Sequence, residues 1–229
     1  MDKPSILLLH GALGSKSDLD PLKELLTPDY DVHQLNFSGH GGQIPDTNFS
    51  IDLFAKDVLE YIKLQKLSPV DIFGYSMGGY VALKVAMNQP SVVGKIFTLG
   101  TKFHWTPESA ANEVKMLNPD KIKEKVPAFA EVLRVRHQPA DWEGVMKKTA
   151  DMMIALGNGE ALNDHEFTSI QNQVLITVGT QDNMVSIEES RHIADQLPNS
   201  KFEAIEGWKH PIDRVDYNDL AKRVRTFLS

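Results

Sequence analysis

The sequence predicts an α/β fold in which a parallel sheet is covered by helices on both faces. Short apolar runs of strand length alternate with segments whose apolar residues recur at helical spacing. One run leads into Gly74-Tyr75-Ser76-Met77-Gly78 and from there into a helical segment, and polar or glycine-rich stretches follow other runs. Strands that alternate with helices pair in parallel through crossover connections. These stretches should therefore gather at one edge of the sheet, where the strands end.

The first part of the chain, residues 1–100, should contain four strands that alternate with three helices. Each expected strand is a short apolar run, and Ser50 is a suitable N-cap for the second helix. The strands are expected at residues 5–9, 30–37, 70–73 and 95–100. The helices are expected at residues 19–26, 50–67 and 80–88.

The pattern changes in residues 101–171, where no strand-like run occurs. Proline at or near the first position of a helix marks several expected starts, at Thr106-Pro107, Asn118-Pro119, Val126-Pro127 and Gln138-Pro139. We therefore expect a helical insertion, 101–171, in a core domain made of residues 1–100 and 172–229. The apolar residues expected to form the core of the insertion are Met116, Phe129, Met146, Met152 and Met153, although some of them could instead face a ligand pocket.

The strand and helix alternation resumes after residue 171, which brings the expected sheet to about six strands. Strands are expected at residues 173–178 and 200–205. The intervening helix should begin at the capping box formed by Ser186 and Glu189, and a final amphipathic helix should span 216–228.

Composition excludes several classes of partner and chemistry. The formal net charge is -7 and no run of lysine or arginine occurs, which argues against binding to nucleic acid or to an anionic membrane. The absence of cysteine excludes disulfides and thiol catalysis. The apolar run at residues 6–9 is too short for a secretory signal or a membrane span, so a cytoplasmic location is expected.

The glycine motif around Ser76 has the pattern of a nucleophile elbow. An apolar strand precedes it and a helix follows, so the chain must turn sharply at the serine. Gly74 and Gly78 leave room for that turn, and the turn would present the serine hydroxyl at the start of the helix. The alternative interpretation is a structural glycine turn.

A serine nucleophile needs a base and an orienting acid. Among eight histidines, His210 is best placed, because it follows the last expected strand. Asp182 follows the preceding strand and is the best acid, with Asp213 as the spare carboxylate near His210. The chain order Ser76, Asp182, His210 is the order that a nucleophile-elbow fold requires.

Two backbone N–H groups should stabilise the oxyanion that forms when the serine attacks. The amide of Met77 at the start of the helix is one candidate. The other should come from the loop after the first strand, where Ala12 is preferred and Leu13 is the alternative. His10 is expected to be structural and to hydrogen-bond this loop, and His40 is expected to be a loop residue.

Lys102, His104 and Trp105 follow the fourth strand at the catalytic edge and are candidate substrate-binding residues. Lys102 could bind an anionic group of the substrate, although a solvated lysine is the simpler interpretation. His104, His137 and His165 lack the spacing of metal ligands, so no metal site is expected.

Taken together, these motifs resemble the α/β-hydrolase superfamily, and in particular its small capped esterase-like members. The resemblance rests on His10-Gly11 with Gly14, on Gly39-His40-Gly41, on residues 74–79, and on Asp182 and His210. It implies hydrolysis of an ester or related acyl bond without a cofactor, and it makes the insertion a cap. The family usually has two more strands at its start, one of them antiparallel. The sheet here should therefore be trimmed to about six strands, all parallel.

The motifs favour a serine hydrolase that cleaves an ester or thioester of a small or medium acyl substrate through an acyl-enzyme. The same triad would also serve a hydrolase of carbon–carbon bonds or an acyltransferase. A third hypothesis is a non-catalytic protein that encloses a ligand under the cap, and the complete triad argues against it.

Overall fold

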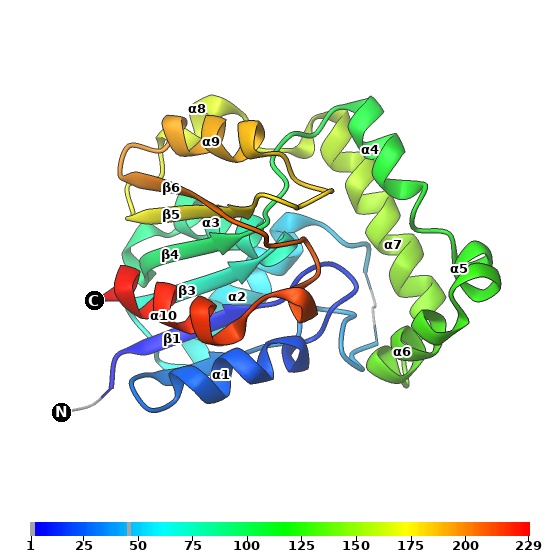
Figure 1. Ribbon diagram of the computed structural model, residues 1–229, viewed down its shortest axis with the longest axis horizontal. Helices are drawn as coiled ribbons and strands as arrows, with labels where there is room; N and C mark the ends of the chain where they lie inside the picture. The colour runs from blue at the N-terminus through cyan, green and yellow to red at the C-terminus, as the bar shows by residue number, and fades with distance from the viewer. Residues whose placement is uncertain (1–2, 45–46) are drawn as a thin grey trace.

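The sheet has six strands, all parallel, in the order β2-β1-β3-β4-β5-β6. Figure 1 shows β1 and β3–β6 side by side in this order. This computed structural model describes residues 3–44 and 47–229. The strands are β1 Ser5–Leu9, β2 Asp31–Gln34, β3 Val70–Tyr75, β4 Val93–Leu99, β5 Val174–Gly179 and β6 Ser200–Ile205. The prediction of a trimmed, all-parallel sheet is confirmed.

The edge strand β2 is shorter than the predicted strand at 30–37. Its last paired residue is Gln34, opposite Leu8. The side chain of Asn36 accepts a hydrogen bond from the backbone N–H of Lys16 and donates one to the carbonyl of Gly41. These bonds hold the following residues in a loop instead of the sheet.

Helices α1 (Asp20–Leu26) and α10 (Tyr217–Leu228) cover one face of the sheet. Alternate residues of the strands point to this side. The residues that form this layer include Ile6, Leu8, Phe73, Phe97, Leu22 and Val224. Helix α10 lies within the predicted range 216–228, and Asp216 caps it, with its side chain accepting from the N–H groups of Asn218 and Asp219.

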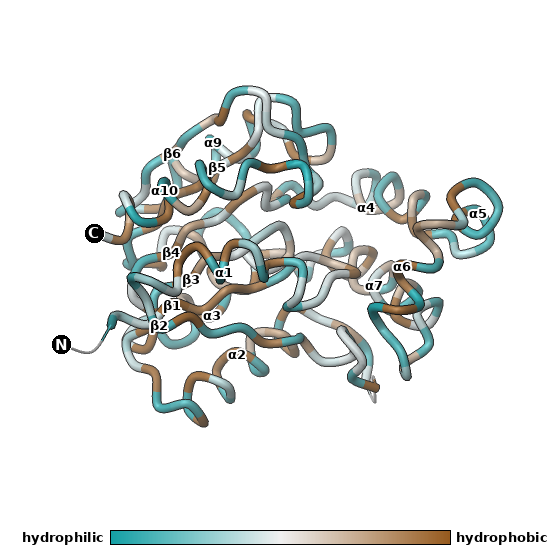
Figure 2. The backbone as a smooth tube through the Cα atoms, turned by 60° about the horizontal axis from the view of Figure 1, so that its bottom comes forward, coloured by the Kyte–Doolittle hydropathy of each residue, from teal (hydrophilic) through white to brown (hydrophobic). Residues whose placement is uncertain are grey.

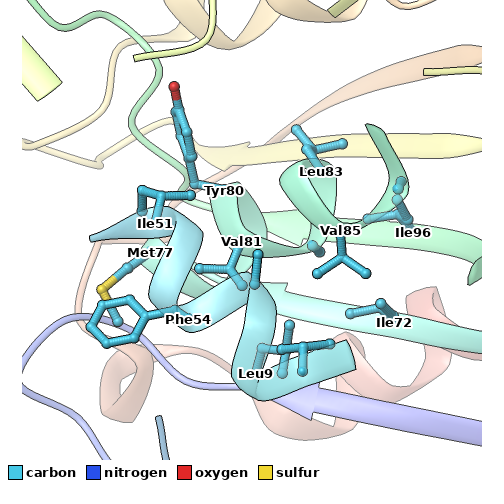
Figure 3. Packing of buried hydrophobic residues seen from close by; sticks show 14 of the residues in the cluster. Leu9, Ile51, Phe54, Ile72, Met77, Tyr80, Val81, Leu83, Val85 and Ile96 are labelled. Atoms are coloured by element: carbon cyan, nitrogen blue, oxygen red, sulfur yellow. The ribbon is translucent and has the colours of Figure 1, made fainter. Parts of the chain in front are cut away.

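Helices α2 (Ile51–Gln65), α3 (Met77–Asn88) and α9 (Ile187–Gln196) cover the opposite face. Figure 3 shows Leu9, Ile72 and Ile96 of the strands packed against residues of α2 and α3. Ser50 caps α2 by accepting from the N–H of Leu53, and the predicted capping box at Ser186 is also present. Within the described residues, short 3-10 helices lie at Lys16–Leu19, Pro90–Val92 and Ile212–Arg214.

The chain between β4 and β5 is helical, as expected. Its helices are α4 Pro107–Val114, α5 Pro119–Lys125, α6 Pro127–His137, α7 Trp142–Ala155 and α8 Asp164–Thr168, with a π-helical turn at Leu156–Glu160. Figure 1 shows α4–α7 beside the sheet, whereas α8 lies next to α9. Apolar and polar residues alternate along the outlying helices α5–α7, and the central strands are more uniformly apolar (Figure 2).

One predicted helix start is wrong. Helices begin at Pro107, Pro119 and Pro127, but not at Pro139. The N–H of Gln138 still donates to the carbonyl of Arg134, so this residue ends α6. The next helix is capped by Asp141, whose carboxylate accepts from the N–H groups at the start of α7.

Two of the residues expected in the core of the insertion are exposed instead. Met116 is 74% exposed in the turn after α4, and Phe129 is 42% exposed at the edge of the buried face of α6. Met146 and Met152 are buried as predicted. The insertion has a small core of its own, formed by Ile122, Ala130, Leu133, Trp142 and Met146.

No helix in the described part of the chain is both long and apolar enough to cross a membrane.

Candidate active site

Ser76 lies at a sharp turn between β3 and α3. Its φ of 51° and ψ of -119° fall in a region that side-chain-bearing residues rarely adopt, at a cost of about 1–3 kcal/mol. The turn is tightly packed, since a Cβ atom at Gly74 would lie 2.4 Å from Cα of Gly79 and one at Gly78 would lie 2.4 Å from the carbonyl oxygen of Leu9. The N–H of Ser76 donates to the carbonyl of Leu99 at 2.8 Å. Close packing therefore holds the strained serine in place.

The structure brings Ser76, His210 and Asp182 together. Oγ of Ser76 lies 3.3 Å from Nε2 of His210, and Nδ1 of His210 lies 2.8 Å from Oδ2 of Asp182. The three residues come from the ends of β3, β6 and β5 or the loops after them. A hydrogen on Nδ1 would bond the carboxylate and leave the lone pair of Nε2 facing the serine hydroxyl.

Asp182 is held by its own loop. Its Oδ1 atom accepts hydrogen bonds from the N–H groups of Met184 and Val185, at 2.8 and 2.9 Å. The side chain is 1% exposed. Asp213, the spare carboxylate of the sequence analysis, is exposed and lies near Arg214 instead. The acid that contacts His210 is therefore Asp182.

Three further residues hold this arrangement from neighbouring elements. The Tyr75 hydroxyl donates to the carbonyl oxygen of His210 at 2.9 Å, and burial raises the pKa of Tyr75, so it stays protonated. Oγ1 of Thr101 donates to the carbonyl oxygen of Ser76 at 3.0 Å. Gly100 has a φ of 61° and lets the end of β4 pass close to Asp182. Sequence reasoning missed all three, although a glycine and a threonine directly after a predicted strand at the catalytic edge are a usable signal.

The loop after β1 forms a tight turn beside Ser76. The N–H of Gly14 donates to the carbonyl of Gly11 at 3.1 Å, and Leu13 has a φ of 56°. Ala12 and Met77 both line the pocket that contains Ser76 and His210, whereas Leu13 is not among the lining residues. The two preferred oxyanion-hole residues thus border one pocket with the serine.

The buried His10 supports this loop, and the buried His40 lies against the ring of His10. Nδ1 of His10 donates to the carbonyl of Gly11 at 2.8 Å, and its Nε2 accepts from the N–H of Phe37 at 3.3 Å, which confirms the structural role expected for His10. Burial lowers the pKa of His10 to about 4. His40 stacks on Phe49 in the loop after β2, and burial holds its pKa well below the usual value. Both rings are neutral near pH 7.

The pocket at Ser76 is narrow and mostly apolar, with a cavity volume of about 50 Å³. Four methionines border it, of which Met152 and Met153 come from α7. The residues that line it are Ala12, Ile51, Ser76, Met77, Tyr80, Lys102, Trp105, Glu113, Met152, Met153, Leu156, Met184, Val185 and His210.

The three candidate substrate-binding residues are placed differently. Lys102 and Trp105 line the pocket, with Nζ of Lys102 5.7 Å from the centre of the Trp105 ring. Nζ also lies 3.2 Å from Oε1 of Glu113 on α4, so the pocket contains an ion pair. His104 is exposed and borders a separate surface groove next to Asp164 and His192. Glu113 was missed, because nothing in its local sequence indicates that α4 faces the pocket.

Within residues 3–44 and 47–229, no group of three or more histidine, aspartate or glutamate side chains is arranged to hold a metal ion.

Known proteins resemble this chain in sequence and in fold over nearly its whole length. A protein of Haemophilus influenzae, named provisionally as an esterase or lipase, is 23% identical over 100% of this chain and 84% of its own length. A Rhizobium rhizogenes protein, named provisionally as the carbamate hydrolase RutD, is 25% identical over 99% of this chain and 93% of its own. The crystal structure of the enol-lactonase from Burkholderia xenovorans has a TM-score of 0.80 at 20% identity, covering 100% of this chain and 92% of that one.

The family model described as the alpha/beta hydrolase fold matches residues 4–132, more than half of the chain. This match agrees with the parallel sheet and with the turn at Ser76. The chain belongs to the α/β-hydrolase family.

Proposed function

We propose that this protein is a serine hydrolase that cleaves the ester or thioester bond of a small or medium acyl substrate. The observation that carries the proposal is the continuous contact from Oγ of Ser76 through His210 to Asp182, at 3.3 and 2.8 Å. The arrangement has the order and the roles of a nucleophile, a base and an acid. The relatives named for esterase, lipase and carbamate hydrolase activity support hydrolysis as the reaction type.

Acylation begins when Nε2 of His210 takes the proton of Ser76 and Oγ attacks the carbonyl carbon of the substrate. Asp182 keeps the imidazole in the required tautomer and stabilises the imidazolium that forms. The new C–O bond converts the carbonyl oxygen into an oxyanion. His210 then returns its proton to the leaving alcohol or thiol, the bond to that group breaks, and the acyl group remains on Ser76.

The oxyanion accepts hydrogen bonds from the N–H groups of Met77 and Ala12. Met77 is the first residue of α3, so its N–H is free of intrahelical bonding and the helix dipole adds a partial positive charge. Ala12 borders the pocket from the opposite loop. In deacylation His210 takes a proton from water, the hydroxide attacks the acyl carbon, and Ser76 recovers its proton as the acid leaves.

The helical insertion acts as a cap, 101–171, over a core made of 1–100 and 172–229. It supplies Glu113, Met152 and Met153 to the pocket. The narrow apolar space favours a small acyl group, and methionine side chains adapt to its shape. An anionic substrate group that binds Lys102 must compete with Glu113, so neutral acyl groups are preferred. Trp105 packs beside this pair, and His104 is not a substrate contact in this proposal.

The same residues could transfer the acyl group to an acceptor other than water or hydrolyse a carbon–carbon bond. An acyltransferase would release more acyl-acceptor product than acid when a competing alcohol is added. A hydrolase of carbon–carbon bonds would act on a diketone and leave simple esters intact. A ligand-binding protein without activity would react with no serine-directed probe.

A fluorophosphonate probe tests the proposal directly. The wild-type protein should be labelled once, at Ser76, and Ser76→Ala should abolish both labelling and the turnover of p-nitrophenyl acetate. Ser169→Ala, which changes an exposed serine on the surface, is the control and should behave as wild type. Turnover that persists unchanged in Ser76→Ala would refute the mechanism.

A further inference from the structure

The C-terminal end of α6 contacts the turn beside Ser76. Two side chains of this helix donate to one acceptor, the carbonyl oxygen of Leu13. Nη1 of Arg136 lies 3.1 Å from this oxygen, and Nε2 of His137 lies 3.1 Å from it as well. The insertion and the loop after β1 are thereby joined through a single backbone atom.

Each of the two side chains also makes a second polar contact, through its other nitrogen atom. Nη2 of Arg136 pairs with Oδ1 of Asp18 at 2.8 Å, and Nδ1 of His137 accepts from the N–H of Gly41 at 3.2 Å. The ring of His137 is buried and must be neutral to make both of its bonds, with its hydrogen on Nε2. Burial lowers the pKa of His137 to about 4, which is consistent with this state. These second contacts therefore fix the orientation of the two groups that donate to the carbonyl of Leu13.

The conformation of Leu13 gives these contacts a consequence. Leu13 is the third residue of the turn closed by Gly14 and Gly11, and its φ of 56° is one that glycine usually adopts there. In turns of this kind the sign of φ at the third residue sets the direction of the central peptide group. Here that group joins Ala12 to Leu13. Without external hydrogen bonds, a leucine would favour the alternative turn, in which this peptide is reversed. The reversal would turn the carbonyl group of Ala12 to the other side of the loop and disturb the adjoining Gly11–Ala12 peptide, which carries the N–H proposed to bind the oxyanion.

We propose that Arg136 and His137 are positioning residues, which hold the Gly11–Gly14 turn in the form that keeps the N–H of Ala12 directed at the oxyanion of the reaction. This inference rests on the proposed function of Ser76. It explains why the two side chains meet on one carbonyl oxygen, which can accept two hydrogen bonds through its two lone pairs. It also assigns the cap a part in the chemistry, because α6 fixes a donor of the oxyanion hole as well as covering the core.

Paired variants on α6 test the proposal. In Arg136→Met with His137→Leu, kcat for p-nitrophenyl acetate should fall by about 10-fold to 100-fold, because a misplaced oxyanion donor loses most of its value. KM should change little, since the ground-state carbonyl makes weaker use of the donors. Affinity for a trifluoromethyl ketone, which forms a tetrahedral adduct with serine, should fall by the same factor as kcat.

Two further variants separate positioning from general structure. His137→Gln can still donate a hydrogen bond to the Leu13 carbonyl. Its kcat should therefore stay close to that of wild type and above that of His137→Leu. Arg134→Met is the control on the same helix, because Arg134 is exposed and pairs with Glu131, and it should leave both kcat and ketone affinity unchanged. If the double variant does not fold, His137→Leu alone provides the comparison with His137→Gln.

The outcomes distinguish this inference from the proposed function. Labelling of wild type at Ser76 combined with wild-type kcat and ketone affinity in the double variant would overturn the positioning role and leave the serine mechanism standing. Equal losses in His137→Leu and His137→Gln would also overturn it, because the hydrogen bond would then be irrelevant. Failure of wild type to react at Ser76 would overturn the proposed function itself.

Discussion

A Cβ atom at Gly100 would lie 3.2 Å from Oδ2 of Asp182, so the end of β4 leaves no free room for a side chain beside the carboxylate that faces His210. The same Cβ would lie 3.4 Å from Nδ1 of His210. The hydrogen bond between acid and base therefore runs directly past a residue with no side chain. Gly100 also has a φ of 61°, which favours glycine independently of the available space.

Gly100→Ala should lower both activity and stability. The positive φ costs about 1–2 kcal/mol for alanine, and the methyl group must displace Asp182 or His210 by a few tenths of an ångström. Because catalysis is sensitive to the geometry of this pair, kcat should fall by about 10-fold or more. Steady-state kinetics and thermal unfolding measure the two effects.

Gly159→Ala is the matched control for backbone strain. Gly159 has a φ of 109°, and a Cβ atom there would have no described neighbour within 4 Å. It should lower the melting temperature without lowering kcat. Equal kcat in Gly100→Ala and wild type would show that the contact with Asp182 does not constrain the pair.

Tyr75→Phe should reduce kcat more than its effect on stability implies. The change removes the hydrogen bond to the carbonyl of His210, worth about 1 kcal/mol, and frees the histidine backbone. We expect kcat to fall by about 5-fold, as measured with p-nitrophenyl acetate. Tyr61→Phe removes the contact between its hydroxyl and Nδ1 of His33, 3.3 Å away at the edge strand β2, and should leave kcat unchanged. Similar kinetics for the two variants would argue against the support from Tyr75.

Asp182→Asn should reduce kcat by about 10⁴-fold, because an amide favours the wrong tautomer of the imidazole. The substitution keeps the size of the side chain, so the protein should remain folded. Asp213→Asn changes the exposed carboxylate near Arg214 and should retain wild-type kcat. The reverse pattern, with the larger loss in Asp213→Asn, would move the role of the acid to Asp213.

The residues that could be predicted from sequence are those that directly follow strands. Ser76, Asp182 and His210 each come at or just after the end of an apolar run, and parallel strands end at one edge of the sheet. The capping residues Ser50 and Ser186 were also predictable, since their side chains bond to backbone only a few residues away. Local pattern therefore determines most element starts and the candidate site.

The packing of α4–α7 could not be predicted in the same way. Helical periodicity shows which residues share a face, but not which face meets the strands. Glu113 and Phe129 illustrate this, because the charged residue lines the pocket and the aromatic one is partly exposed. His137 is a further example, because its contacts with Gly41 and Leu13 bridge 96 and 124 residues of chain. Such long-range contacts have no local signal.

Stability should fall as the pH drops from about 6.5 towards 4. His137 has a folded pKa of about 4 against 6.5 in the unfolded chain, because burial and the charge of Arg136 disfavour its protonated form. Between these values the unfolded chain binds more protons than the folded one, so protons favour unfolding. Each such histidine lowers the free energy of unfolding by about 1.4 kcal/mol per pH unit in that window. His40, whose ring meets that of His137 edge-on, and His10, whose ring lies tilted against that of His40, act in the same direction.

Urea unfolding of wild type and His137→Gln at pH 7 and pH 5 measures this contribution. The wild type should lose more stability between the two pH values than the variant does, by about 2 kcal/mol. Equal losses in both proteins would show that His137 is not the buried neutral group described above.

The central claim is that Ser76 carries the acyl group during turnover. The most direct measurement is to mix the protein with p-nitrophenyl acetate, quench with acid within the first turnover, and locate the acetyl group by mass spectrometry of peptides. The account predicts one acetyl group per chain, on Ser76, together with a stoichiometric burst of p-nitrophenol. Continued turnover with Ser76 unmodified, or with the acetyl group on another residue, would contradict it.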